Sequence, residues 1–240
     1  MSEAYGSDFW RHAVLEGKGI LSDIQIAFLE LFAGLPDQDQ FYLTKGTALS
    51  EYYLGHRLSY DLDLFTSQSD LIIPFSFQIE RAAKAANIGI EVVRRFESFV
   101  EFQVIMGEEI LKVDLALNAP FRFSPPEMSE TGVLVNGLED IQADKTLAYF
   151  GRVEPRDAID LYFLLKDAGY DRLVDLARQK EAGFDLYWFA VSLNRVAGFP
   201  DEIERWPVKM LVMCNVAELK RIFLDLAMRI MDELTKGENQ

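Results

Sequence analysis

The stretch Leu43–Phe65 constrains the fold more than any other part of the chain. It leaves an apolar run, turns twice at glycines, and ends in a run where Asp61 and Asp63 alternate with Leu62 and Leu64. Side chains alternate between the two faces of a strand, so a sheet that buries both leucines presents both carboxylates on its other face. Two like charges this close repel each other and need water or a cation to compensate them. The stretch therefore predicts a strand, a short helix and a second strand with an acidic face.

The acidic pair predicts a magnesium site. Mg²⁺ prefers oxygen ligands and is commonly bound by one or two carboxylates together with substrate phosphates. The alternative is an ordinary solvated strand edge, because Asp-x-Asp is also common by chance. Gly46 and Thr47 precede the pair at a strand-to-helix turn. A backbone without a Cβ can approach a phosphate there, and the N–H groups that begin a helix can bind it. Together these features favour a pocket for a metal–nucleotide complex.

Two segments carry a further signal, Gly46-Thr47-Ala48-Leu49 and Arg57-Leu58-Ser59-Tyr60-Asp61-Leu62-Asp63-Leu64-Phe65. They resemble the AbiEii/AbiGii-type nucleotidyltransferase toxins of the polymerase-β-like nucleotidyltransferase superfamily. The family pattern is a Gly-Gly or Gly-Ser turn, a helix, an Arg-x-Ser-x-Asp-x-Asp strand, a later Asp on a strand, and a Lys and an Asp on helices. The resemblance covers roughly residues 41–165. It implies an α/β (α+β) fold with a mixed sheet flanked by helices, followed by a helical C-terminal part.

The resemblance also assigns the turn. Gly46 and Thr47 would hold the β- and γ-phosphates of a nucleoside triphosphate. The family usually has two small residues here, and Lys45 stands where the first glycine is expected. We expect Lys45 to alter the geometry of the phosphate cradle or to add a cation near the phosphates.

Arg57 and Ser59 precede the two acids in the same motif. By alternation, Ser59 shares a face with the acids, and Arg57 lies at the entrance of the strand. The functional hypothesis is that Arg57 contacts phosphate and Ser59 orients a carboxylate. The alternative is that Arg57 pairs with an acidic neighbour.

Asp114 is a lone acid in the apolar run Val113–Leu117. An unpaired buried charge is expensive, so this carboxylate must reach water or have a partner. The resembling superfamily has a third catalytic carboxylate on a strand beside the Asp-x-Asp strand, and Asp114 matches that position. The resemblance thus implies that Asp61, Asp63 and Asp114 bind two Mg²⁺ ions, with Asp114 also helping to deprotonate the acceptor hydroxyl. The alternative for Asp114 is a solvent-facing acid in a β-hairpin.

Lys145 lies in a segment where the family has a lysine that reaches the nucleotide phosphates. Its expected helix, Leu138–Phe150, also contains Asp144 and Glu139, and the alternative is an exposed lysine paired with one of these acids.

Asp157 matches the last family motif, within Arg-Asp-x-x-Asp-Leu, and is a further functional candidate. It also follows Pro155 in the first turn of a predicted helix, where an acid is favourable in any protein. For Asp160 we expect a supporting contact to Arg152 or Arg156.

Composition narrows the classes of function. The formal net charge of -15 argues against a protein that coats nucleic acid non-specifically, because a phosphate backbone demands a basic surface. Cys214 is the only cysteine, so no internal disulfide is possible, and a reducing cytoplasm is expected. His12 and His56 are too few for a Cys/His zinc cluster. No apolar run is long enough to span a bilayer, so no membrane partner is expected.

Apolar periodicity and turn residues predict the remaining elements. The expected helices are Phe9–Glu16, Ser22–Leu35, Ser76–Asn87, Leu138–Phe150, one from Pro155, Leu173–Ala182, Leu186–Val196, Val208–Val212 and Val216–Leu234. The expected strands are Phe41–Thr44, Ile88–Val93, Phe99–Met106, Glu109–Leu117 and Val133–Val135, and residues 118–131 read as a loop. We expect a nucleotidyltransferase core over residues 1–136 and a helical domain over residues 137–240.

The resulting functional hypothesis is a Mg²⁺-dependent nucleotidyltransferase that moves a nucleoside monophosphate from an NTP to an RNA (tRNA) or protein acceptor. The resemblance implies the toxin of a toxin–antitoxin or phage-defence pair, with a cognate antitoxin as partner. The alternatives are a non-catalytic nucleotide- or partner-binding module that keeps the fold, and a phosphotransferase that releases ADP.

Overall fold

The computed structural model describes residues 14–237, which contain a seven-stranded sheet in the order β3-β4-β5-β2-β1-β7-β6. The strands are β1 Tyr42–Thr44, β2 Leu62–Thr66, β3 Gly89–Phe96, β4 Phe99–Met106, β5 Glu109–Leu117, β6 Glu127–Met128 and β7 Leu134–Val135. Strand β1 pairs antiparallel with β2 and parallel with β7, and β2 pairs parallel with β5. The sheet is therefore mixed, and the predicted fold class is confirmed.

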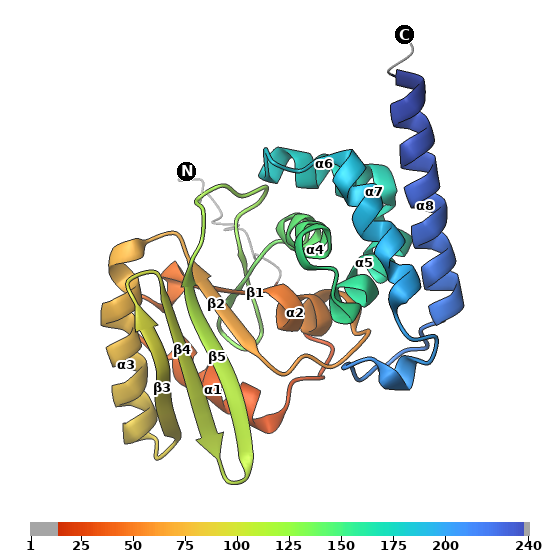
Figure 1. Cartoon of the computed structure of the whole chain (residues 1–240). Coiled ribbons are helices and arrows are strands. Elements are labelled where there is room, and N and C mark those ends of the chain that lie inside the picture. Colours follow the sequence, from red (N-terminus) through yellow and green to blue (C-terminus); the bar gives the residue numbers. More distant parts are fainter. Residues whose placement is uncertain (1–13, 238–240) are drawn as a thin grey trace, which may run out of the picture.

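Helices α1 (Asp23–Ala33) and α3 (Ile72–Ala85) cover one face of the sheet (Figure 1). The strands bury their apolar side against them, and Leu62, Leu64, Val113 and Leu115 are all fully buried. Because side chains alternate along a strand, the acids between these residues point to the opposite face. The local pattern that the sequence predicts is therefore the one that the fold uses.

A short helical segment follows β1 directly. It consists of α2 (Lys45–Ala48) and a π-helical turn, η2 (Leu49–Leu54). The segment ends at Gly55, whose φ of 63° lies in the left-handed region that favours glycine. The two turns return the chain to the sheet as β2, antiparallel to β1.

The C-terminal half is helical, as expected. It contains α4 (Leu138–Arg152), α5 (Pro155–Ala168), α6 (Tyr170–Lys180), α7 (Leu186–Asn194) and α8 (Val216–Gly237), and Figure 1 shows these helices gathered on the side of the molecule away from α3. The short turns are η1 (Gln38–Gln40), η3 (Ser69–Leu71), η4 (Arg195–Gly198) and η5 (Ile203–Arg205). No helix in the described part of the chain has the length and apolarity that a membrane crossing requires. A single buried cluster includes residues from both halves, so the division after residue 136 stays a prediction.

Three expected helices differ in the structure. Residues 208–212 are not helical but extended, and the Leu58 N–H donates to the Lys209 carbonyl at 2.8 Å. The expected helix Phe9–Glu16 lies mostly outside the described residues, and its described end is extended, with the Leu15 N–H bonded to the Met128 carbonyl at 2.9 Å. Helix α3 begins at Ile72 instead of Ser76, because Pro74 is tolerated in a first turn, where N–H groups have no helical partner.

Candidate active site

A pocket of about 370 Å³ lies over the acidic face of the sheet. Most predicted site residues line it, together with segments from both halves of the chain: Lys45, Gly46, Arg57, Leu58, Ser59, Tyr60, Asp61, Asp63, Lys112, Asp114, Lys145, Arg152, Arg156, Pro207 and Val208. Thr47 and Asp157 are the two predicted residues that do not line it. A larger and more open groove between α3 and β3 has Glu80 as its only acid. The predicted cluster of carboxylates therefore lies in the pocket over the acidic face of the sheet and not in this groove.

The three predicted acids lie on one wall of this pocket. Asp63 on β2 is the direct partner of Asp114 on β5 in the parallel register, so their side chains share a face of the sheet. Asp61 lies immediately before β2 and lines the same pocket. Asp63 and Asp114 are 8% and 6% exposed. Carboxylates of like charge thus lie together where they have little access to water. Nearby positive charge is needed to stabilise them.

Two lysines supply that charge. Lys45 Nζ lies 2.7 Å from Asp63 Oδ1, and Lys112 Nζ lies 2.8 Å from Asp114 Oδ2. The other oxygen of Asp114, Oδ1, is buried without a hydrogen-bond partner. Burial raises the pKa of the Asp114 carboxyl, and the neighbouring Asp63 charge adds to this against the lowering effect of Lys112. Asp114 is therefore more ready to take up a proton than an ordinary carboxylate.

The glycine turn is fitted closely to the Arg-x-Ser motif. A Cβ on Gly46 would lie 2.8 Å from Ser59 Oγ and 3.0 Å from Arg57 Nη2, so no larger residue fits without a shift. The buried Thr47 hydroxyl donates to the main-chain carbonyl of Asp61. The side chain of Thr47 therefore fixes the backbone of a predicted metal ligand, and only its N–H remains a candidate for phosphate.

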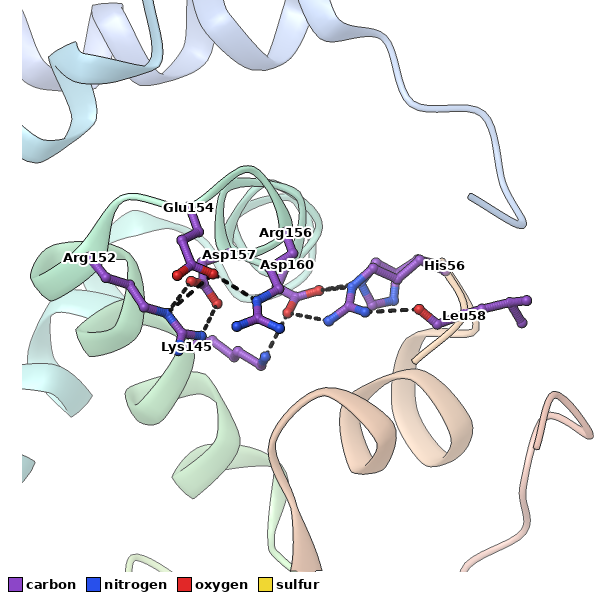
Figure 2. A network of polar contacts seen from close by, with 9 residues as sticks. His56, Leu58, Lys145, Arg152, Glu154, Arg156, Asp157 and Asp160 are labelled. Carbon is purple, nitrogen blue, oxygen red and sulfur yellow. Dashed lines mark hydrogen bonds and ion pairs between the residues drawn. The ribbon is translucent and has the colours of Figure 1, made fainter. Parts of the chain in front are cut away.

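Asp160 on α5 is the centre of a buried ion network (Figure 2). It accepts from Arg57 Nε at 2.7 Å and Arg57 Nη2 at 2.8 Å, contacts Lys145 Nζ at 2.7 Å, and lies 2.8 Å from His56 Nε2. Arg57 and Lys145 are each 5% exposed. Asp160 therefore holds two pocket-lining cations in fixed positions. Arg57 forms an ion pair with an acid far along the chain, and its contact with phosphate stays a prediction.

The contacts within this network shift the pKa values of Asp160 and His56. Burial alone would raise the pKa of Asp160, but Lys145, Arg57 and the His56 hydrogen bond hold that pKa well below its ordinary value. Burial lowers the pKa of His56 despite the opposing effect of Asp160, so the imidazole is neutral at pH 7. Asp160 is thus an anion at neutral pH, in contact with Arg57 and Lys145.

The family model for the nucleotidyl transferase AbiEii toxin of type IV toxin–antitoxin systems matches residues 28–211, which is most of the chain. The chain belongs to this family. The family resemblance predicted from Leu43–Phe65 is therefore confirmed.

Two solved structures share the fold, and one further protein is similar in sequence. JHP933 from Helicobacter pylori matches with a TM-score of 0.60 and 20% identity, covering 90% of this chain and 92% of that one. The nucleotidyltransferase toxin MenT4 from Mycobacterium tuberculosis H37Rv matches with a TM-score of 0.53 and 14% identity, covering 85% and 82%. A protein from Aquifex aeolicus (strain VF5), described only as uncharacterized, is 28% identical over 180 residues, covering 73% of this chain and 82% of its own.

In this AbiEii-family chain the two acids of the last motif, Asp157 and Asp160, have different partners. Asp157 is fully buried and binds Arg152 through two contacts of 2.6 and 2.8 Å. We expected Asp160 to support Arg152 or Arg156, but it pairs instead with Arg57, from the segment before β2, and with Lys145 on α4. Our expectation for Asp160 was wrong because its partners are fixed by packing between distant elements. The sequence contains a signal that could have identified Asp160 as a buried, paired acid. Like Asp114, it is an acid within an apolar run, here Ala158–Leu161.

The surroundings of Lys145 also differ from the alternative considered from the sequence. It is not an exposed lysine paired with Asp144 or Glu139, because its ammonium is buried against Asp160 at the pocket wall. Lys180 from α6 pairs with Asp144, at 2.8 Å. Whether Lys145 reaches a phosphate stays a prediction.

Sequence reasoning missed one wall of the AbiEii pocket. The extended segment 207–212, called the strap below, crosses the Arg-x-Ser motif and forms a bridge between Arg57 and Met210. Pro207 and Val208 of the strap line the pocket. The C-terminal half therefore takes part in the site, although its sequence carries no chemical motif.

The acids fit a hard divalent cation in chemistry, although they are not arranged as a ready cage. Among residues 14–237, no group of three or more His, Cys, Asp or Glu side chains is placed to hold a metal. The donors at the wall are all carboxylate oxygens, as Mg²⁺ prefers, and the orphaned Asp114 Oδ1 offers a free ligand position. Asp61, Asp63 and Asp114 are the residues that could bind the ion, with Lys45 and Lys112 displaced.

Proposed function

We propose that this AbiEii-family protein is a Mg²⁺-dependent nucleotidyltransferase that moves a nucleoside monophosphate from an NTP to an acceptor hydroxyl. The observation that supports it is the meeting of Asp61, Asp63 and Asp114 at a pocket whose other walls carry fixed cations. Family membership supports the same chemistry.

The reaction replaces one bond at phosphorus by another. The acceptor oxygen forms a bond to the α-phosphorus, and the bond from the α-phosphorus to the bridging oxygen of pyrophosphate breaks. The acceptor proton passes to Asp114, a carboxylate at the pocket wall that acts as the general base. Pyrophosphate leaves with the electron pair of the broken bond.

The remaining side chains position the anionic substrate. The N–H groups of Gly46 and Thr47 bind the β- and γ-phosphates at the start of α2. Lys145 and Arg57, held by Asp160, face the triphosphate as preorganised cations that need no rearrangement during the reaction. Asp61, Asp63 and Asp114 would hold Mg²⁺, and the bound metal would supply positive charge that stabilises the phosphate during transfer.

We further infer that the acceptor is an RNA (tRNA) or a protein, and that the protein is the toxin of a toxin–antitoxin or phage-defence pair with a cognate antitoxin. The description of the family as a type IV toxin supports the second point. The lone Cys214 supports a reducing cytoplasm as the place of action.

A second candidate function is a non-catalytic module that binds a nucleotide or a partner. The observation that favours it is that Lys45 and Lys112 already neutralise two of the three acids. Such a protein would bind triphosphate without turning it over.

The test is to incubate the protein with each α-labelled triphosphate, Mg²⁺ and total cellular RNA or protein. We expect label in one acceptor pool and release of pyrophosphate, whereas a phosphotransferase would release ADP. Asp63→Asn should abolish the transfer and remain folded, because Asp63 lies on the site face and not on the core face. Transfer by Asp63→Asn at the parental rate would refute the assignment.

A further inference from the structure

Lys45 has a backbone conformation that is unusual for its residue type. Its φ of 58° lies in the left-handed region, where a side chain is strained and glycine is not. A residue held at such a conformational cost points to a use for its side chain.

The side chain reaches back into the pocket. Its ammonium lies 2.7 Å from Asp63 Oδ1 and 4.6 Å from the centre of the Phe65 ring, so both partners belong to β2. The side chain is 45% exposed and Asp63 only 11%. Lys45 therefore approaches Asp63 from the solvent side and can leave it without opening the core.

Three other cations of the pocket, Arg57, Lys145 and Lys112, are placed differently. Arg57 and Lys145 are buried on Asp160 and cannot move without leaving that acid uncompensated. Lys112 lies on the sheet, two residues from Asp114 on the same strand. Lys45 alone among these four side chains combines a half-exposed ammonium with a place next to the N–H groups of Gly46 and Thr47.

We infer that Lys45 is an exchangeable counter-ion that occupies Asp63 until a metal–triphosphate enters and then moves to the terminal phosphates. This inference rests on the proposed function. A divalent ion and an ammonium repel each other when both lie against the same carboxylate, so the metal must displace Lys45. The released ammonium then has the triphosphate as its nearest anion. Lys45 thereby opposes binding of metal alone and favours binding of metal together with nucleotide.

The two effects have opposite signs, and this makes the inference testable. Mn²⁺ binding is titrated by electron paramagnetic resonance, first to the protein alone and then with an α,β-methylene nucleoside triphosphate that cannot be cleaved. In Lys45→Met, we expect Mn²⁺ alone to bind about three- to tenfold more tightly. The Mn²⁺–analogue complex should bind about tenfold more weakly, while Lys45→Arg should stay close to the parent in both titrations.

Two further variants separate the ammonium from the backbone and from net charge. Lys45→Gly should reproduce both shifts of Lys45→Met and melt at a higher temperature than it, because glycine is unstrained at this φ. Lys84→Met removes one exposed charge on α3, outside the residues that line the pocket, and should change neither affinity.

Each contrary result has a distinct meaning. Unchanged Mn²⁺ affinity in Lys45→Met, or a loss of both affinities, would overturn the exchange and leave the proposed function standing. Equal Mn²⁺ binding by the parent and by Asp63→Asn would show that no metal site exists at Asp63, which would overturn both.

Discussion

Replacing Asp160 by Asn tests whether the buried ion network is a requirement of the fold. The carboxylate is fully buried and contacts Arg57 through two nitrogens, Lys145 through one and His56 through one. An Asn side chain of the same size keeps one acceptor oxygen, loses the negative charge, and points an NH₂ group at cations. Two buried positive charges would then lack an anion.

The expected cost follows from these contacts. At least two charge-assisted hydrogen bonds are lost, each worth about 1.5–3 kcal/mol. Breaking a buried ion pair by removal of one partner costs about 3–5 kcal/mol, because the remaining charge cannot reach water. Arg57 and Lys145 are each 5% exposed, so neither can be rehydrated without moving the chain. We expect Asp160→Asn to lower the free energy of unfolding by about 3–5 kcal/mol.

The same helix supplies the matched control. Asp157 lies one turn earlier, is equally buried, and also binds an arginine through two nitrogens. Its partner Arg152 has a side chain that is 45% exposed and can turn into water. Asp157→Asn should therefore cost only about 1–2 kcal/mol.

Both variants are measured by urea unfolding, followed by tryptophan fluorescence and circular dichroism. The slope of free energy against urea should match the parent, so that the midpoint reports stability. If Asp160→Asn lowered the free energy of unfolding by less than Asp157→Asn does, the reasoning would be refuted. The burial of the cationic partners would then not determine the loss of stability.

Three other predictions follow from the site. Gly46→Ala should lower the free energy of unfolding by about 1–3 kcal/mol and slow pyrophosphate release, because the new Cβ would lie 2.8 Å from Ser59 Oγ; a variant with parental melting and rate would contradict this. His56 has a lowered pKa in the fold, so below the unfolded-state value of about 6.5 the unfolded chain binds a proton that the folded chain does not, and stability falls with pH down to the folded pKa. Urea midpoints across this range should fall less steeply in His56→Phe, and equal slopes would mean that His56 is not the group responsible. Removal of divalent cations with EDTA should stop pyrophosphate release, and added Mg²⁺ should restore it; release that persists in EDTA would argue against the metal site.

Local chemistry predicted the acidic face at Asp61 and Asp63, and the family resemblance placed Asp114 beside them. Alternation along β2 and β5 fixes which face each side chain takes, and burial of Leu62 and Val113 leaves Asp63 and Asp114 no other side. The turn at Gly46 and the helix that begins at Leu138 were likewise predicted from residues within a few positions of each other. Such features need no knowledge of distant parts of the chain, because neighbouring residues fix them.

The conformation of the strap could not be predicted from local sequence patterns. Residues 208–212 have the apolar character of a helix, yet they are extended because their backbone pairs with residues 56–58. Residues 56–58 lie about 150 positions earlier in the sequence, and no local sequence pattern predicts this pairing.

The sequence by itself determined that Asp61 and Asp63 share one face, because this depends only on the order of residues within a strand. The family and the mixed sheet followed from the resemblance carried by Leu43–Phe65. Only the tertiary structure decided the partners of the charges: Asp160 binds an arginine 103 positions away, and Lys45 turns back onto Asp63. The physical reason is that a buried charge must find an opposite charge in space, and which one it finds depends on how the helices pack against the sheet.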